Sequence, residues 1–241
     1  MSQITKFLFG KLHNIHTPKA LTVIKIGDKA LLKATEKVLD VKDHIVQNTA
    51  TDMLYTAQTV LTAEGRLGIA APQLGINNSI FCFRLPKDCP NPRYKAMWNV
   101  ETEYPWTLVI NPEITIATDK KSAMLEPCAS FFPGISALVV RPTEVICKYI
   151  DIYGAQKAIH AKGTLARLIQ HEYDHLEGIT ALQRVPNTNF VKFDMEYMEL
   201  SQLSIIKALV GTECVAPSDY SDLHTAALGQ IPYIHELNFV S

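Results

Sequence analysis

A short segment with two histidines and a glutamate constrains this chain more than any other feature. His171, Glu172 and His175 follow the pattern His-Glu-x-x-His. Residues four apart lie on the same face of a helix, so both imidazoles can reach one metal ion while Glu172 lies beside them. An unpaired polar group in a core costs several kcal/mol, and a metal ion would satisfy a buried cluster of this kind. The sequence therefore predicts a metal-binding helix.

The residues around the motif indicate where this helix begins and ends. Thr164, which follows Gly163, suits an N-cap, and Gly178 suits the left-handed position that ends a helix. We expect the helix to lie in the core because apolar residues share its motif-bearing side. These residues are Leu165, Leu168, Ile169 and Leu176.

A third metal ligand must come from elsewhere in the chain, because two imidazoles do not complete the coordination of a divalent ion. Cys128 is the first candidate. Metzincin peptidases carry a third histidine where this chain has Ala181, so their motif is not met. Other zinc peptidases take a glutamate from a following helix. The spacing from the motif leaves Glu196 and Glu199 open as such ligands.

Composition favours one globular domain in a reducing compartment. The chain has 241 residues, of which 47% are hydrophobic and 20% charged, enough for one core with appendages. A formal net charge of −1 argues against nucleic acid or a membrane surface as a partner. Five cysteines without a Cys-x-x-Cys pair do not suggest a disulfide framework. We expect a bacterial-type cytoplasmic protein, with an organelle as the alternative because residues 1–27 lack acids.

Apolar patterning divides the chain into three parts. Residues 1–19 form an N-terminal arm, residues 20–186 form the main domain, and residues 187–241 form an extension with one helix, over 193–210. Strands precede and surround the motif helix instead of alternating with helices, so the predicted fold class is α+β. In the main domain we expect a helix over 41–63, a long irregular loop over 85–106, and strands over 79–84, 107–110, 113–117, 137–150 and 156–161.

Three separated motifs resemble those of the peptide deformylase family. Residues 66–73 (RLGIAAPQ) resemble GxGxAAxQ, and residues 126–130 (EPCAS) resemble EGCLS. Residues 170–175 (QHEYDH) match QHExDH in full. Three motifs in this order and spacing are far more specific than the third alone. The resemblance implies mainly antiparallel sheets around the central motif helix.

The resemblance implies that Cys128, His171 and His175 hold the metal ion and that Glu172 is the catalytic base. A thiolate with two imidazoles suits Fe(II), Zn(II), Ni(II) or Co(II), and we expect Fe(II). The implied reaction is hydrolysis of the N-formyl group from the initiator methionine of nascent peptides, which releases formate. N-formylmethionyl peptides are the expected partners, and the ribosome is a further candidate.

Further residues take their implied roles from the same resemblance. The Gln73 amide and the backbone N–H of Ala129 would stabilise the developing oxyanion together with the metal ion. Arg141 would support the site by pairing with Glu126, with a solvated surface position as the alternative. For Met124 and Leu168, ordinary core packing is an equal alternative to a place in the methionine pocket. The substrate-binding candidates are Leu67, Gly68, Met124 and Leu168.

Three substitutions within the motifs fall where the peptide would lie. Arg66 replaces the first glycine of the first motif, and Ala129 replaces a leucine. Pro127 replaces the glycine before the cysteine and has no N–H to donate. These changes leave open a divergent paralogue with weak or altered activity that binds metal or peptide N-termini. A zinc endopeptidase with Glu196 or Glu199 as a ligand is the other alternative.

Overall fold

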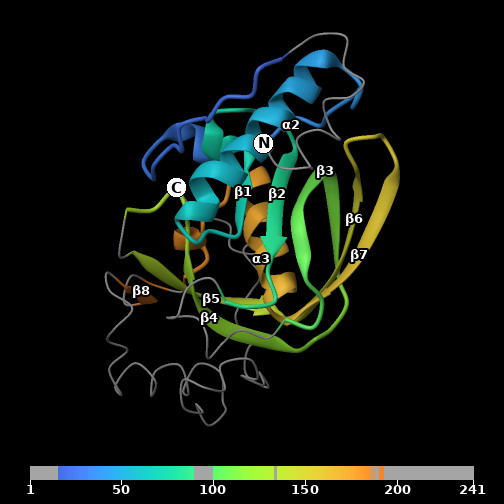
Figure 1. Ribbon diagram of the computed structural model, residues 1–241. Coiled ribbons are helices and arrows are strands. Elements are labelled where there is room, and N and C mark those ends of the chain that lie inside the picture. The colour runs from blue at the N-terminus through green and yellow to red at the C-terminus, as the bar shows by residue number, and fades with distance from the viewer. Residues whose placement is uncertain (1–15, 90–99, 133–134, 186, 188–189, 193–241) are drawn as a thin grey trace.

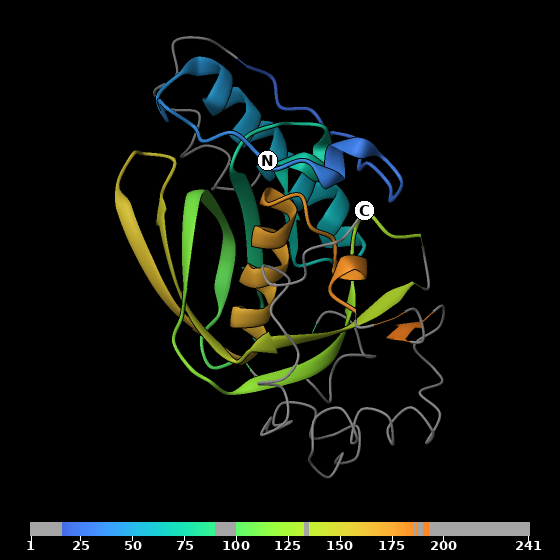
Figure 2. The same ribbon diagram turned by 180° about the vertical axis from the view of Figure 1, so that it is seen from behind.

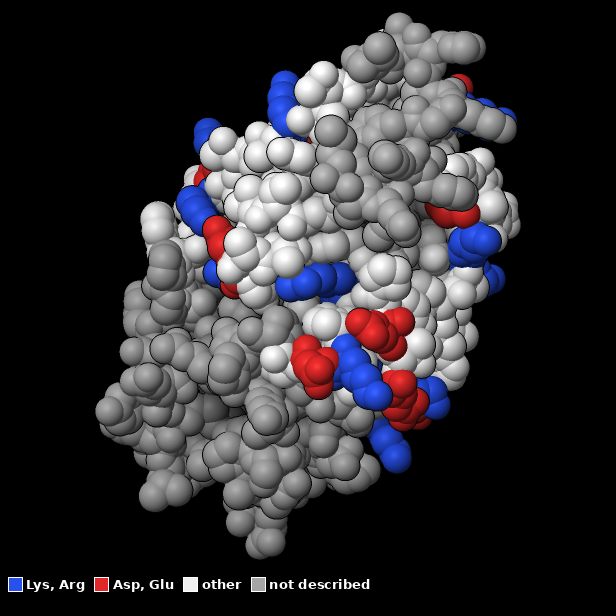
Figure 3. All heavy atoms as spheres, viewed as in Figure 1, with Lys and Arg blue, Asp and Glu red and all other residues white. Residues whose placement is uncertain are grey.

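The motif helix lies between two antiparallel sheets (Figures 1 and 2). The structure is a computed structural model, and it describes residues 16–89, 100–132, 135–185, 187 and 190–192. Among the described residues, no helix has both the length and the apolar character needed to cross a bilayer. On the face shown in Figure 3, lysines and arginines lie among acidic side chains, in keeping with the formal net charge of −1.

The larger sheet has five strands in the order β1-β2-β3-β6-β7, and every neighbouring pair is antiparallel. Its strands are β1 (Gly68–Ala70), β2 (Ile80–Leu85), β3 (Tyr104–Ile116), β6 (Glu144–Ile150) and β7 (Gln156–Lys162). The smaller sheet has the order β4-β5-β8 and is also antiparallel. Its strands are β4 (Lys121–Pro127), β5 (Ser136–Pro142) and β8 (Val191–Lys192).

Strand β2 is buried on both of its faces, which explains its nearly continuous apolar sequence. Ile80 and Cys82 pack into a cluster with α2, while Phe81 and Phe83 pack into a cluster with α3. Alternate residues of a strand point to opposite faces, so each helix covers one side of the five-stranded sheet. The helices are α2 (His44–Thr56), which continues as the π-helical turn η2 (Ala57–Leu61), and α3 (Gly163–Leu176).

Helix α3 begins directly at the end of β7. Its N-cap is Lys162, whose side chain makes no capping hydrogen bond. The prediction of Thr164 as the N-cap is wrong. A Thr164 cap would start the helix at Leu165, whereas the helix starts two residues earlier, at Gly163. The predicted end is confirmed, since Gly178 has φ 72. A Cβ there would lie 2.8 Å from the carbonyl carbons of Leu32 and Lys33, so glycine also allows close packing.

Several predicted strands have different bounds in the structure. The predicted strands over 107–110 and 113–117 are one strand, β3, with a register shift between Ile110 and Glu113. The predicted strand over 137–150 is two strands, β5 and β6, separated at Thr143. The helix predicted over 41–63 is confirmed as α2 and η2. The helix predicted over 193–210 lies outside the described residues.

The register shift in β3 is stabilised by Asn111. This residue has φ 49, the left-handed conformation that asparagine adopts more readily than most residues. Its side chain accepts from the Val38 N–H at 2.9 Å and donates to the Val38 carbonyl at 2.7 Å. Asn111 therefore joins the bulge in the sheet to the segment that precedes α2.

We expect Asn111→Ala to lower the free energy of unfolding by about 2–4 kcal/mol, because it removes two hydrogen bonds and because alanine adopts the left-handed region less readily than asparagine. Asn111→Gly is the matched control, since it loses the same hydrogen bonds but glycine adopts the left-handed region without strain. Its free energy of unfolding should therefore fall by less than that of Asn111→Ala. Urea unfolding curves measure both values. A wild-type curve for the alanine variant would contradict this account.

Candidate metal centre

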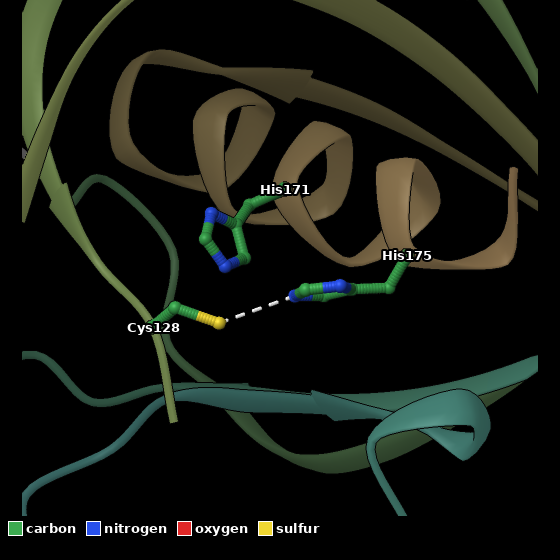
Figure 4. A group of neighbouring side chains, drawn as sticks. All are labelled: Cys128, His171 and His175. Carbon is green, nitrogen blue, oxygen red and sulfur yellow. Dashed lines mark hydrogen bonds between the residues drawn. The ribbon is translucent and has the colours of Figure 1, made fainter. Parts of the chain in front are cut away.

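One cysteine and two histidines converge in the core between α3 and the end of β4. The Sγ of Cys128 and the ring nitrogens of His171 and His175 all lie within 4.8 Å of one another. Sγ is 3.3 Å from Nε2 of His175, and the two imidazole centroids are 5.1 Å apart (Figure 4). All three residues are buried. The pair of histidines comes from consecutive turns of α3, as the motif spacing predicts.

Glu126, on β4, fixes the orientation of one imidazole. Nδ1 of His171 lies 2.8 Å from Oε2 of Glu126, which leaves Nε2 directed toward the cysteine and the other ring (Figure 4). A carboxylate on the outer nitrogen sets the tautomer of a metal-binding histidine and raises its basicity. Nδ1 of His175 is buried without a hydrogen-bond partner among the described residues.

Two arginines hold the Glu126 carboxylate in place. Arg141 contacts both carboxylate oxygens, at 2.7 and 2.9 Å, and Arg167 contacts one of them at 2.6 Å. Burial alone would raise the pKa of Glu126, but these arginines and the hydrogen bond with His171 hold it well below its usual value. The predicted pairing of Arg141 with Glu126 is confirmed, and its surface alternative is wrong because Arg141 is 2% exposed.

The buried charges continue beyond Glu126 along the same side of α3. Arg141 also contacts Asp174 at 2.8 Å, and Asp174 pairs with Arg184. The sequence analysis missed Arg167, Asp174 and Arg184. Helical spacing could have suggested Arg167, which precedes His171 by four residues and so shares its face.

The surroundings of Cys128 favour its thiolate form. Burial would raise the pKa of this thiol, but the charge of His175 and hydrogen bonds from both imidazoles hold it well below its usual value. The Gln73 amide nitrogen also lies 3.3 Å from Sγ. Thiolate, not thiol, is the form of cysteine that binds metals. The three donors therefore have the chemistry that a borderline divalent ion requires.

Glu172 lies beside the three donors without a full set of hydrogen bonds. Its side chain is buried, and its Oε2 has no hydrogen-bond partner among the described residues. Burial is the main cause that raises the pKa of Glu172 to about 7, although the charges of His171 and His175 oppose this shift. A carboxyl group with a pKa near neutrality can both accept and return a proton.

Gly68 lies directly against Glu172. A Cβ on Gly68 would lie 2.7 Å from Cδ and 2.9 Å from Cγ of Glu172, closer than real contacts allow. Substrate binding by Gly68 stays a prediction, and the structure shows that this residue leaves room for the Glu172 side chain. A side chain at position 68 would displace the Glu172 carboxyl group from its observed position.

The two predicted oxyanion residues border the same centre. Gln73 is buried, its Oε1 accepts from the Ala70 N–H at 2.8 Å, and its Nε2 donates to Ser130 Oγ at 3.0 Å. Ala129 follows Cys128 directly, and its carbonyl accepts from Lys25 Nζ at 2.9 Å. The structure thus brings both predicted residues to the metal-ligand cluster.

The remaining pocket candidates are partly buried. Leu67 precedes β1, Met124 lies within β4, and Leu168 packs against the apolar cluster on the α3 side of the sheet. The structure shows core packing for Leu168, while its part in substrate binding stays a prediction, as do those of Leu67 and Met124.

Arg66 has an ordinary backbone conformation beside a glycine in the left-handed region. Gly65, one residue earlier, has φ 67, and Arg66 has no positive φ. The Arg66 N–H donates to the Leu61 carbonyl at 2.8 Å, which closes the end of the preceding helix. The backbone at Arg66 therefore does not need the conformational freedom of glycine.

Comparison with known proteins identifies the family. The family described as polypeptide deformylase matches residues 20–190. A peptide deformylase from Picosynechococcus sp. is 35% identical over 162 residues, which cover 67% of this chain and 77% of that protein. The chain belongs to the peptide deformylase family. Deformylase activity is thereby favoured over the alternative of a zinc endopeptidase. The candidate metal ligands of that alternative, Glu196 and Glu199, lie outside the described residues.

Solved deformylase structures have the same fold. The enzyme from Ehrlichia chaffeensis matches with a TM-score of 0.60 and 30% identity, over 71% of this chain and 90% of that one. A class I type b deformylase from Acinetobacter baumannii with bound Met-Ala-Ser matches with a TM-score of 0.59 and 28% identity, over 70% of this chain and 100% of that one. The predicted α+β fold is confirmed. Deformylases are metal-dependent hydrolases, and the Cys-His-His cluster is a possible metal-binding site in this one.

We expect Gly68→Ala to lower kcat for a formyl-Met peptide by at least about a hundredfold, because the new methyl group displaces Glu172. The variant should also unfold at lower urea concentration. In a Glu172→Ala background the same substitution should cost little stability, since the clash has been removed. A Gly68→Ala enzyme with wild-type kcat would show that Glu172 does not need its observed position.

Proposed function

We propose that Cys128, His171 and His175 hold the catalytic metal ion of this deformylase, with Glu172 as its general base. The observation that carries the proposal is the convergence of one thiolate and two imidazoles within 4.8 Å in a buried site. Three protein ligands leave one coordination position open for reaction, as in catalytic zinc sites. The enzyme hydrolyses the N-formyl group of formylmethionyl peptides and releases formate.

The donor set indicates which metals fit. One thiolate with two imidazoles suits Fe(II), and we propose Fe(II) as the native ion, with Zn(II), Ni(II) and Co(II) as substitutes. Such an ion, when bound, supplies a Lewis acid that polarises the formyl group and lowers the pKa of water. His171 is prepared for this role by Glu126, which holds its outer nitrogen at 2.8 Å.

Glu172 carries the proton through the reaction. It accepts a proton from the attacking water, whose oxygen forms the new bond to the formyl carbon. When the C–N bond breaks, Glu172 gives this proton to the leaving nitrogen, so that the products are formate and a free amino terminus. Its unpartnered oxygen and its place against Gly68 leave the carboxyl group available for this transfer.

Two hydrogen-bond donors stabilise the charge that develops on the formyl oxygen. They are the side-chain amide of Gln73 and the backbone N–H of Ala129. Gln73 is oriented by the Ala70 N–H and Ser130 Oγ, and the N–H that faces Cys128 Sγ is the one that would turn to the formyl oxygen. Preorganised donors of this kind are worth about 2.7–4 kcal/mol each in transition-state stabilisation.

The peptide itself binds along β1. This strand is at the end of the five-stranded sheet, and among the described residues no strand pairs with its outer edge. An extended peptide can add to such an edge by backbone hydrogen bonds. Pro127, at the end of β4, has no N–H, so the carbonyl is the only one of its backbone groups that can hydrogen-bond to a peptide. Leu67, Met124 and Leu168 are the proposed walls of the methionine pocket.

We also propose the cytoplasm as the site of the reaction and the ribosome as a candidate partner. The substrate is formed on nascent chains, which supports both assignments. The buried residues Cys82, Cys128 and Cys147 are not in disulfides, which suits a reducing compartment.

Paired substitutions separate metal binding from proton transfer. We expect Glu172→Ala to keep its metal ion and to lose hydrolysis of formyl-Met-Ala-Ser by several orders of magnitude, because only the base is removed. We expect Cys128→Ala to lose both the metal ion and the hydrolysis. Elemental analysis of anaerobically purified protein and formate release measure the two properties.

Near wild-type turnover by Glu172→Ala would rule out this residue as the base. Full metal retention by Cys128→Ala would mean that the third ligand lies elsewhere, as an endopeptidase-type site would require. A wild-type enzyme that binds metal and releases no formate from any formylmethionyl peptide would contradict the proposed activity itself.

A further inference from the structure

A short segment near the start of the described chain contacts both loops that carry the proposed oxyanion donors. The Ile24 N–H donates to the Gln73 carbonyl at 2.8 Å. The Ile26 N–H donates to the Ser130 carbonyl, also at 2.8 Å. We call residues 24–26 the strap. It joins the first motif to the second through backbone hydrogen bonds, independently of the metal ligands.

The side chain of Lys25 adds a third contact from the strap. Its Nζ donates to the Ala129 carbonyl at 2.9 Å, in a partly buried position. Lys25 is an exposed residue, and this bond joins its side chain to the residue after Cys128. A hydrogen bond from an ionised donor is roughly twice as strong as one between neutral groups. The peptide after Ala129 is therefore held by a charged group outside the metal centre.

We propose that Lys25 is a positioning residue for deformylation. The inference rests on the proposed role of the Ala129 N–H as an oxyanion donor. The carbonyl and the N–H of Ala129 belong to two successive peptide groups that meet at its Cα. Holding the carbonyl restrains one of these groups directly, and it limits the range of directions in which the N–H of the other can point.

The second oxyanion donor is fixed through separate contacts. Gln73 is held at its carbonyl by the Ile24 N–H and at its side-chain oxygen by the Ala70 N–H, and neither contact involves the loop of Ala129. Its contact with Ser130 Oγ is the one that it shares with that loop. Loss of the Lys25 ammonium would therefore loosen the Ala129 donor and leave the Gln73 donor in place. An oxyanion donor acts mainly in the transition state, so its displacement lowers kcat more than it changes KM.

The sharpest test compares Lys25→Met with Lys25→Arg. Methionine keeps the apolar stem and removes the charged donor, while arginine restores a donor of similar reach. We expect Lys25→Met to lower kcat about tenfold, with KM, metal content and Tm unchanged, and Lys25→Arg to recover most of the loss. Lys29→Met is the matched control, because Lys29 is an exposed lysine four residues further along the chain, and its kcat should equal that of the wild type.

Two kinetic results would overturn the proposal. A wild-type kcat in Lys25→Met would mean that the ammonium does not position the donor. A rise in KM with unchanged kcat would mean that Lys25 contacts the peptide instead of the enzyme's own loop.

Hydrogen exchange tests the positioning separately from the proposed function. In the metal-loaded protein without substrate, we expect amides within residues 128–131 to exchange faster in Lys25→Met than in the wild type or Lys29→Met. Equal exchange would contradict the proposal even in an active enzyme. If the wild type released no formate, the proposed function would fail while this measurement still decided whether Lys25 restrains the loop.

Discussion

The burial of the Glu126 carboxylate between two arginines and His171 is the interaction on which the rest of the site depends. A charge in the core is tolerated only when opposite charges and hydrogen bonds replace its lost hydration. Arg141 and Arg167 meet this requirement, and the remaining acceptor capacity of Glu126 directs one imidazole toward Cys128. The same contacts tie β4, β5 and α3 together, so the geometry of the metal centre and the packing of α3 on the three-stranded sheet have a common origin.

Much of the metal centre could be predicted because the sequence patterns that specify it lie within short segments of the chain. The four-residue spacing of the histidines requires a helix if both are to face one ion, and Gly178 ends that helix in the left-handed conformation that its position suggested. Strand β2 was also predictable, since a run of apolar residues indicates a strand covered on both faces. Cys128 was placed with the histidines by the resemblance of three motifs, not by any local pattern.

The parts that sequence analysis missed depend on contacts between distant segments. Strand β1 has only three residues, too few to show a period, and β4 contains a lysine, a serine and a glutamate that obscure its buried character. The steric need for glycine at position 68 comes from Glu172, more than a hundred residues later in the chain. The glycine beside Arg66 lies one position before the place where the family motif has one.

The catalytic machinery is held by two separate sets of contacts. Buried ion pairs on one side of α3 orient the metal ligands, whereas the strap and the Gln73–Ser130 bond hold the loops beside them. Arg66 and Pro127 take part in neither set of contacts, so these substitutions are compatible with the proposed metal ligands and the proposed base.

X-ray absorption spectroscopy of the anaerobically purified protein tests the central claim most directly. The account predicts one transition-metal ion, iron in the native protein, with a single sulfur neighbour at about 2.3 Å and two imidazole nitrogens at about 2.0–2.1 Å, by analogy with zinc–ligand distances. A metal environment with nitrogen and oxygen neighbours but no sulfur would contradict it, because Cys128 would then not share an ion with the two histidines.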